Sequence, residues 1–262
     1  MGEKLKSLNA LMVEKVKMSI KINSLPLPYF FTMMPMKTPI ISQDTLSFLK
    51  EIAENNHREW FAEQKKRYDA IAKENKLFFQ QIFEALQRHD EVTRMHIFRI
   101  YKDVRFSKDK SPYKTNFGVA FSRKKPELRG GYYLHIAPNQ SFVGGGFWAP
   151  EKEDMYRFRK ELEMDDTPIR SIITEPTFQE YFKTIQGDDA VKIAPKGFDK
   201  NHPAMDLIKK KQWVVMRPFT DEQVMNESFL IETIKTFLAM RPWFDYMSDV
   251  LTTDLNGESI IG

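Results

Sequence analysis

The stretch that decides the fold is IFRIYKDVRFSKDKSPYKTNF, residues 97–117. Its first half alternates between apolar and polar side chains, which predicts a β-strand with one buried face. The apolar set is Phe98, Ile100, Val104 and Phe106, and the polar set is Arg99, Tyr101, Asp103 and Arg105. Side chains on the same face of a strand stand about 6.6 Å apart. The polar set is therefore close enough to contact one ligand, and we expect a site on this strand.

The stretch is strongly basic, with six Lys or Arg residues against Asp103 and Asp109, a local net charge of +4. Residues 1–37 also carry +4, from six lysines and two glutamates, so residues 38–262 hold 34 basic and 34 acidic residues and are neutral. A nucleic-acid-binding module usually carries a basic excess over a whole face. The confined charge therefore favours a small anionic ligand, with nucleic acid as the less favoured partner.

The N-terminal region reads differently from the rest. Its apolar run over residues 25–36 is interrupted by prolines, which argues against a signal peptide, and no stretch reaches the length of a membrane span. We expect residues 1–37 to be a poorly ordered extension, with Met33, Met34 or Met36 as an alternative start. The chain has no cysteine, which excludes disulfides and thiol nucleophiles and is typical of the reducing cytoplasm.

From Ser42 onward the pattern predicts one α+β domain over residues 38–262. Helices are expected over 42–54 and 63–88, with a short helix between them started by Asn56 and Glu59 at capping-box spacing. Strands are expected over 97–106, 117–121, 132–137, 141–148 and 213–216. The short connections between the first four favour an antiparallel meander sheet, with the remaining helices packed on its apolar face.

The polar face of this sheet also receives Asn116 and His135, and small residues leave space above it. Those small residues are Gly118, Ala120, Gly144, Gly145 and Gly146. Polar groups beside such a hollow predict a pocket. The catalytic candidates are Tyr101, Asp103 and His135, with Asp103 held ionised by its arginine neighbours and acting as an orienting group. The candidates for binding an anion are Arg99, Arg105, Lys108, Lys110, Lys114, Arg159, Lys196 and His202.

Each candidate also has a structural interpretation. The polar row can be an ion-pair network in a non-catalytic scaffold, and residues 107–114 can be a charged hairpin tip. His135 can be a hydrogen-bonded sheet residue, and His202 fits a turn or helix cap better than a ligand. The chain lacks H-E-x-x-H, G-x-S-x-G and dinucleotide motifs, and Asp103, His135 and His202 have no metal-ligand spacing. No metal is predicted, and the cofactor, the reaction and the oligomeric state stay open.

Three stretches resemble motifs of one family of conserved hypothetical proteins, the domain of unknown function numbered 2461. They are FRIYKDVRFSKDKSPYKT (98–115), NNHREWF (55–61) and PKGFDKNHP (195–203). Tyr132 to Ile136 and Arg159 also fit this family, and Lys102 stands where it often has arginine. The resemblance spans about residues 40–250 and implies one fold with a site near the central motif. It implies no activity.

Overall fold

The structure is a computed structural model that describes residues 39–187 and 190–261. The predicted extension over residues 1–37 lies outside the described residues, so the domain boundary stays a prediction. None of the helices in the described part of the chain is both long and apolar enough to cross a bilayer. The helices and strands, in chain order, are α2 (Gln43–Glu54), α3 (Arg58–Gln87), β1 (Val92–Ile97), β2 (Phe117–Arg123), β3 (Gly131–Ile136), β4 (Ser141–Phe147), α4 (Lys152–Met164), α5 (Thr167–Thr174), α6 (Pro176–Tyr181), α7 (Met205–Ile208), β5 (Trp213–Phe219), α8 (Asp221–Met225), α9 (Phe229–Ala239) and α10 (Arg241–Thr252).

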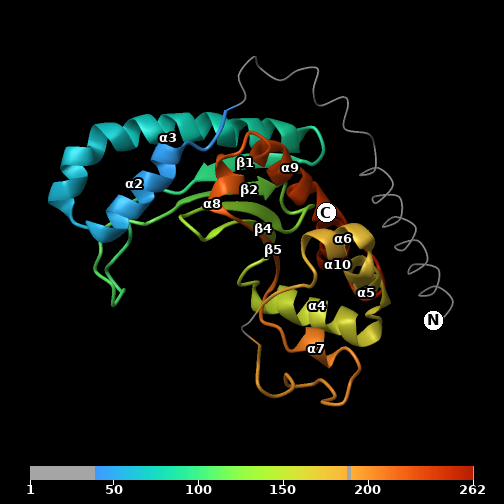
Figure 1. Ribbon diagram of the computed structural model, residues 1–262. Helices are drawn as coiled ribbons and strands as arrows, with labels where there is room; N and C mark the ends of the chain where they lie inside the picture. The colour runs from blue at the N-terminus through green and yellow to red at the C-terminus, as the bar shows by residue number, and fades with distance from the viewer. Residues whose placement is uncertain (1–38, 188–189, 262) are drawn as a thin grey trace.

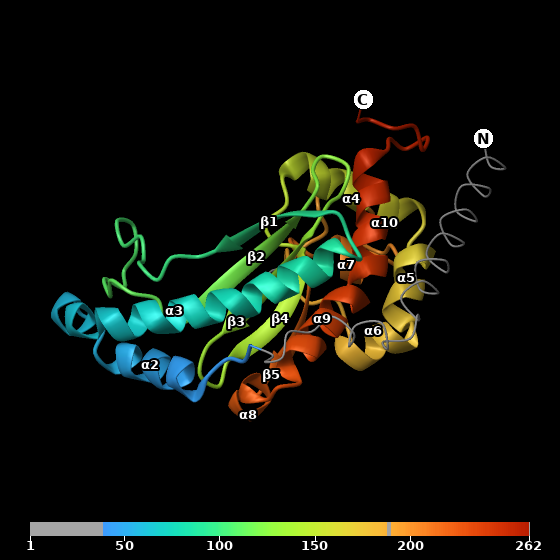
Figure 2. The ribbon, with the colours of Figure 1, turned by 90° about the horizontal axis from the view of Figure 1, so that it is seen from above.

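The strands of the described residues form one antiparallel sheet in the order β1-β2-β3-β4-β5. Each strand pairs with its neighbour in the chain, so the predicted α+β fold with a meander sheet is confirmed. Helices α3 and α9 pack against each other and lie over one face of the sheet (Figures 1 and 2). Helices α4 to α7 fill the connection between β4 and β5.

The helix-covered face is the apolar face that the alternation predicts. Its buried side chains on β2 and β3 are Phe117, Val119, Phe121, Tyr132, Leu134 and Ile136. The Phe237 ring of α9 lies 5.7 Å from the ring of Phe121 and 5.1 Å from that of Tyr132, centroid to centroid. Each large apolar side chain buried in this way contributes about 1.5–3 kcal/mol. The burial of this face therefore holds α3 and α9 to the sheet.

The predicted first strand over residues 97–106 is wrong, because β1 ends at Ile97. Residues 98–116 form an irregular extension of the β1–β2 hairpin, which we call the hairpin arm. Within the arm, Lys102 N donates to Pro112 O at 2.8 Å and Lys114 N donates to Ile100 O at 2.7 Å. The pairing of β2 with β3 begins only at Phe117, so beyond it the arm has no third strand beside it. Because a hairpin of two strands alone is only marginally stable, the arm does not keep the regular strand pairing of the sheet.

The predicted capping box of Asn56 and Glu59 is also wrong. Helix α3 begins after His57, whose Nδ1 accepts a hydrogen bond from Trp60 N, and it continues without interruption for 30 residues. The Asn56 amide instead binds the hairpin arm: Nδ2 donates to Tyr113 O and Oδ1 accepts from Tyr113 N, each at 3.0 Å. The side chain expected to start a helix thus fixes the position of the arm.

Candidate functional site

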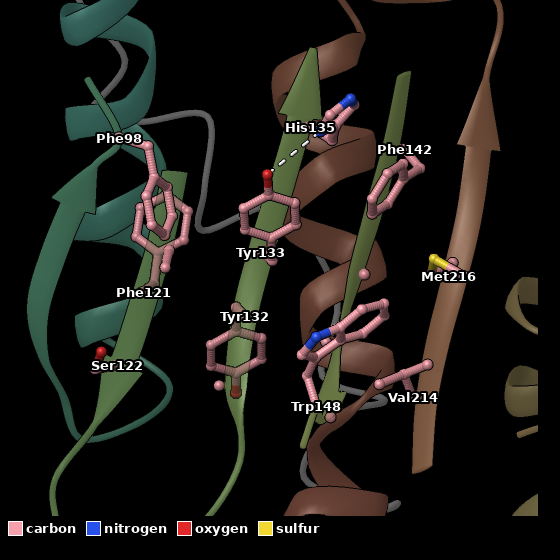
Figure 3. Close-up of a pocket in the computed structure, with 15 residues that line it drawn as sticks. Phe98, Phe121, Ser122, Tyr132, Tyr133, His135, Phe142, Trp148, Val214 and Met216 are labelled. Carbon is pink, nitrogen blue, oxygen red and sulfur yellow. Dashed lines mark hydrogen bonds between the residues drawn. The ribbon is translucent and has the colours of Figure 1, made fainter. Parts of the chain in front are cut away.

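The face of the sheet turned away from α3 and α9 is hollowed by a pocket of about 590 Å³ (Figure 3). All of β2 to β5 contribute to it, and Phe98 closes it where the hairpin arm leaves the sheet. Its lining includes Phe98, Ala120, Tyr133, His135, Phe142, Gly144, Gly146, Trp148 and Met216. Most of this lining is apolar and aromatic, and a few polar groups interrupt it.

Glycines in the middle of β4 belong to the pocket lining. A Cβ atom on Gly144 would lie 2.8 Å from Val215 O and 2.9 Å from Met216 Cγ, so these neighbours leave no room for a side chain there. Gly146 has a φ of +131°, which side-chain-bearing residues rarely adopt. Gly118 has a different role from the one predicted, since a Cβ there would lie 2.6 Å from the Tyr133 hydroxyl. The space above Gly118 is therefore filled by Tyr133, and Met216 borders the space beside Gly144.

His135 lies on β3 with its ring at the edge of the pocket. The ring stacks on Phe142 with centroids 4.9 Å apart and planes 13° apart. Its Nδ1 lies 3.3 Å from the Tyr133 hydroxyl and 3.4 Å from Asn116 Nδ2. Because an amide nitrogen can only donate, Nδ1 accepts and the neutral ring carries its proton on Nε2. Burial lowers the pKa of His135, so the ring is uncharged at neutral pH.

Two cations lie together where the hairpin arm joins the pocket. Lys114 Nζ is 5.3 Å from the centroid of the Phe98 ring, within the range of a cation–π contact. Burial lowers the pKa of Lys114, and the positive charge of Arg99 lowers it further. Neither cation has a carboxylate within ion-pair distance among the described residues, although the positive charge of Arg99 helps to lower the pKa of Asp103. We call Arg99 and Lys114 the cationic rim.

The rest of the predicted polar row lies away from the pocket, on the hairpin arm. Arg105 donates to Asp103 through Nε at 2.9 Å and Nη2 at 2.6 Å. These hydrogen bonds are the main reason why the pKa of Asp103 is lowered. Tyr101 is exposed, with its ring 5.8 Å from that of Phe61. Tyr101, Asp103 and Arg105 therefore do not line the pocket, although the charge of Arg99 still acts on Asp103.

The two remaining lysines of the arm are exposed. Lys110 Nζ donates to Val104 O at 3.0 Å, and Lys108 lies beside it in the chain. Neither lysine lines the pocket.

Three further binding candidates, Arg159, Lys196 and His202, lie outside the lining of the pocket. Arg159 on α4 donates to Ile208 O at 2.8 Å and to Lys210 O at 2.9 Å, so it joins α4 to the end of α7. His202 Nδ1 accepts from Ala204 N at 3.2 Å, the turn role that the sequence favoured. The helix that follows this turn, α7, is only four residues long. Lys196 is an exposed loop residue.

A buried ion-pair network beneath the sheet was missed at the sequence level. The Arg123 side chain is fully buried, with Nε 2.8 Å from Asp90 Oδ2 and Nη2 2.6 Å from Asp245 Oδ1. The Tyr132 hydroxyl donates to the same Asp90 carboxylate. A signal was present, because Arg123 continues the buried alternation of Phe117, Val119 and Phe121. The predicted strand over residues 117–121 ended too early to include Arg123 in this pattern.

Trp148 was also missed, although it lines the pocket with 71% of its surface exposed. Its indole lies between β3 and Val214 of β5 (Figure 3). The sequence did contain a signal for this residue, because Trp148 closely follows the three glycines 144–146 of a predicted strand, which is where an aromatic side chain can border a pocket.

The family model described as conserved hypothetical protein (DUF2461) matches residues 44–246. The chain belongs to this family. All three motifs that resembled it fall within the matched residues, as do the pocket and the cationic rim. Among curated proteins and among solved structures, no match to the chain was found. This match identifies the DUF2461 family and assigns no ligand or activity.

The open face of this DUF2461 protein provides hydrogen-bond donors, aromatic surface and positive charge. Burial raises the pKa of Tyr133, so its hydroxyl stays protonated and can donate. In the described ranges 39–187 and 190–261, no three or more His, Asp or Glu residues are grouped so that they could hold a metal ion. The pocket thus combines a mostly apolar and aromatic lining with a few polar groups, and Lys114 lies against Phe98 at its edge.

Proposed function

We propose that this protein binds a small anionic ligand in the pocket on the open face of its sheet, with the anionic group held by Arg99 and Lys114. The observation that carries the proposal is the cationic rim, where Lys114 lies against Phe98 and close enough to Arg99 for the two positive charges to repel each other. An anion placed there relieves the repulsion between them. It also gains charge-assisted hydrogen bonds, which are among the stronger ones in proteins.

The pocket itself supports the proposal. Its volume of about 590 Å³ lies in the range of small-molecule sites, which are mostly apolar with a few placed polar groups. Arg105, Lys108 and Lys110 on the hairpin arm would add to the field that attracts an anion. Arg105 would contribute least, because Asp103 already neutralises it.

If the protein is an enzyme, His135 is the group placed to transfer a proton, because it borders the pocket and its Nδ1 is fixed by Tyr133 and Asn116. Tyr101 and Asp103, the other catalytic candidates, lie on the arm. A role for them would require the arm to move over the pocket.

A second candidate function is a scaffold in which the arm's charges are structural. The pairs Asp103–Arg105 and Lys102–Asp109 favour it. Exposed ion pairs contribute only about 0–1 kcal/mol each, so they account poorly for Arg99 and Lys114, which are unpaired among the described residues.

The test is calorimetric titration of the full chain with 2-naphthoate and 2-naphthyl phosphate. We expect binding that weakens about tenfold in Lys114→Gln and again in Arg99→Gln, which corresponds to about 1.4 kcal/mol for each cation. Lys124→Gln is the matched control, because Lys124 is an exposed lysine away from the pocket. Affinities that are equal in the wild type and the two rim variants would refute the proposal and favour the scaffold.

A further inference from the structure

We infer that the ligand is an aromatic acid, whose flat ring system lies on the glycine floor of the pocket while its acidic group reaches Arg99 and Lys114. This inference rests on the proposed function and adds the chemical class of the ligand. It depends on the shape of the floor, the nature of the walls and the scarcity of polar groups.

The floor is formed in part by backbone, because Gly144, Gly145 and Gly146 of β4 line the pocket and have no side chains. Gly144 lies between Tyr133 of β3 and Met216 of β5, its partners in the sheet. A Cβ atom on Gly144 would lie 2.9 Å from Met216 Cγ, so the Met216 side chain borders this glycine. A planar ring can contact such a lining over its whole face. A puckered saturated ring touches it with only part of its atoms, and each lost contact weakens the dispersion attraction.

The walls beside this floor are aromatic. The Tyr133 and Phe142 rings have centroids 5.8 Å apart and planes 49° apart, and Phe142 is stacked on His135. Trp148 borders the floor on the other side, where most of its indole is exposed (Figure 3). Aromatic pairs prefer offset or edge-to-face arrangements and gain energy beyond the burial of their surface. A ring on the floor would meet such partners and would cover the exposed indole.

The polar groups are too few for a ligand with many hydroxyls. Within the lining, the side chains that can form hydrogen bonds include Ser122, Tyr133, His135 and Trp148. The Tyr133 hydroxyl and His135 Nδ1 already contact each other. A sugar placed there would leave hydroxyl groups without partners, which is unfavourable in a buried position. The charge is at one end of the pocket, beside Phe98, which suits a molecule with a single acidic end.

The experiment compares three probes that share one carbon skeleton: 2-naphthoate, which is flat and anionic; decahydro-2-naphthoate, which is anionic and puckered; and 2-naphthamide, which is flat and neutral. Binding to the full chain is measured by calorimetry. We expect 2-naphthoate to bind at least tenfold more tightly than either of the others. We also expect Lys114→Gln to weaken both carboxylates and to leave the amide unchanged.

The outcomes separate the two claims. If both carboxylates bind equally and both weaken in Lys114→Gln, the proposed function stands and the aromatic inference is overturned. If the amide binds as tightly as 2-naphthoate, the anion site is overturned, and the acid part of the inference with it. If none of the three binds, both claims are overturned.

A matched pair of variants tests the ring directly. Trp148→Leu should weaken 2-naphthoate at least fivefold and leave decahydro-2-naphthoate unchanged. Tyr156→Leu is the control, because Tyr156 is an exposed aromatic residue on α4 that does not line the pocket. Both side chains are exposed, so the variants should fold. Equal affinity for 2-naphthoate in the wild type and Trp148→Leu would contradict the stacking of a ring beside the indole.

Discussion

The side chain of Asn56 and the backbone of Tyr113 form two reciprocal hydrogen bonds, each 3.0 Å long, between positions 57 residues apart. The ring of Tyr113 also stacks on Phe61 of α3, with centroids 4.1 Å apart. Asn56 and Phe61 lie in the NNHREWF stretch, and Tyr113 lies in the central motif that supplies the cationic rim. One family motif therefore holds the other in place, next to the pocket.

Asn56→Ala should loosen the hairpin arm. Tyr113 is only 4% exposed, so its backbone groups would lose their partners in a place that water reaches poorly. We expect a loss of about 1–3 kcal/mol in the free energy of unfolding, measured by urea denaturation. Amide hydrogen exchange at Lys102 and Lys114 should accelerate, because both amides bond across the arm. Asn55→Ala, which removes one bond to Glu51 O, should leave this exchange unchanged. Unaltered exchange in Asn56→Ala would disprove the anchoring role.

Arg123→Met should be strongly destabilising. The substitution keeps much of the side-chain volume but leaves the Asp90 carboxylate, 1% exposed, without its closest cation. Breaking one partner of a buried ion pair costs about 3–5 kcal/mol. Lys124→Met is the control, since Lys124 forms exposed pairs with Glu91 and Glu127 and should lose no more than about 1 kcal/mol. Similar urea midpoints for the two variants would show that the buried pair contributes little.

The stability of the protein should fall between pH 7 and pH 5.5, in part because of His135. Burial lowers its pKa in the folded protein, while the unfolded chain titrates near the ordinary value of about 6.5. Between those two pKa values the unfolded state binds more protons, so stability decreases as the pH falls. His135→Gln should therefore lose less stability over this interval. Burial also lowers the pKa of His89, so part of the slope should remain.

The control for this pH experiment is His96→Gln, because His96 is an exposed histidine on β1. Its pH profile of stability, measured by urea denaturation, should follow that of the wild type. Proton NMR of the His135 ring checks the cause directly. A titration midpoint of His135 at or above 6.5 would contradict the burial argument.

Gly146→Ala and Gly197→Ala separate backbone strain from crowding. Both glycines have positive φ, +131° and +87°, so alanine is strained at either position. A Cβ at position 146 would also clash with Trp213 O, whereas at position 197 no heavy atom lies within 4 Å. We expect Gly197→Ala to cost about 1 kcal/mol and Gly146→Ala clearly more, by urea denaturation. Equal losses would mean that β5 moves away freely from β4.

Much of the helical part could be predicted from local sequence. Ser42 caps α2 as expected, with its hydroxyl accepting from Thr45 N at 3.3 Å. The apolar spacing of Leu46, Leu49 and Ile52 correctly marks the buried side of α2. Such signals depend on neighbours three or four residues apart, so the chain itself contains all the information. Asn56 shows where local sequence fails to predict the structure. Its amide could have capped the helix that follows it, but it binds the backbone of the distant Tyr113 instead.

The sequence by itself determined the family, the alternation of β2 and β3, and the meander, because these follow from motifs, from period-two burial and from short turns. Only the tertiary structure decided that β1 ends at Ile97, that Arg123 is buried, and that Asp103 and Arg105 pair with each other outside the lining of the pocket. The physical reason is that alternation defines a face only while a neighbouring strand continues beside it. Beyond the end of β3, residues 98–116 continue the alternating pattern but have no third strand beside them, so they form the hairpin arm. Of the cations on the arm, Arg99 and Lys114 are those nearest the last paired residues of the sheet.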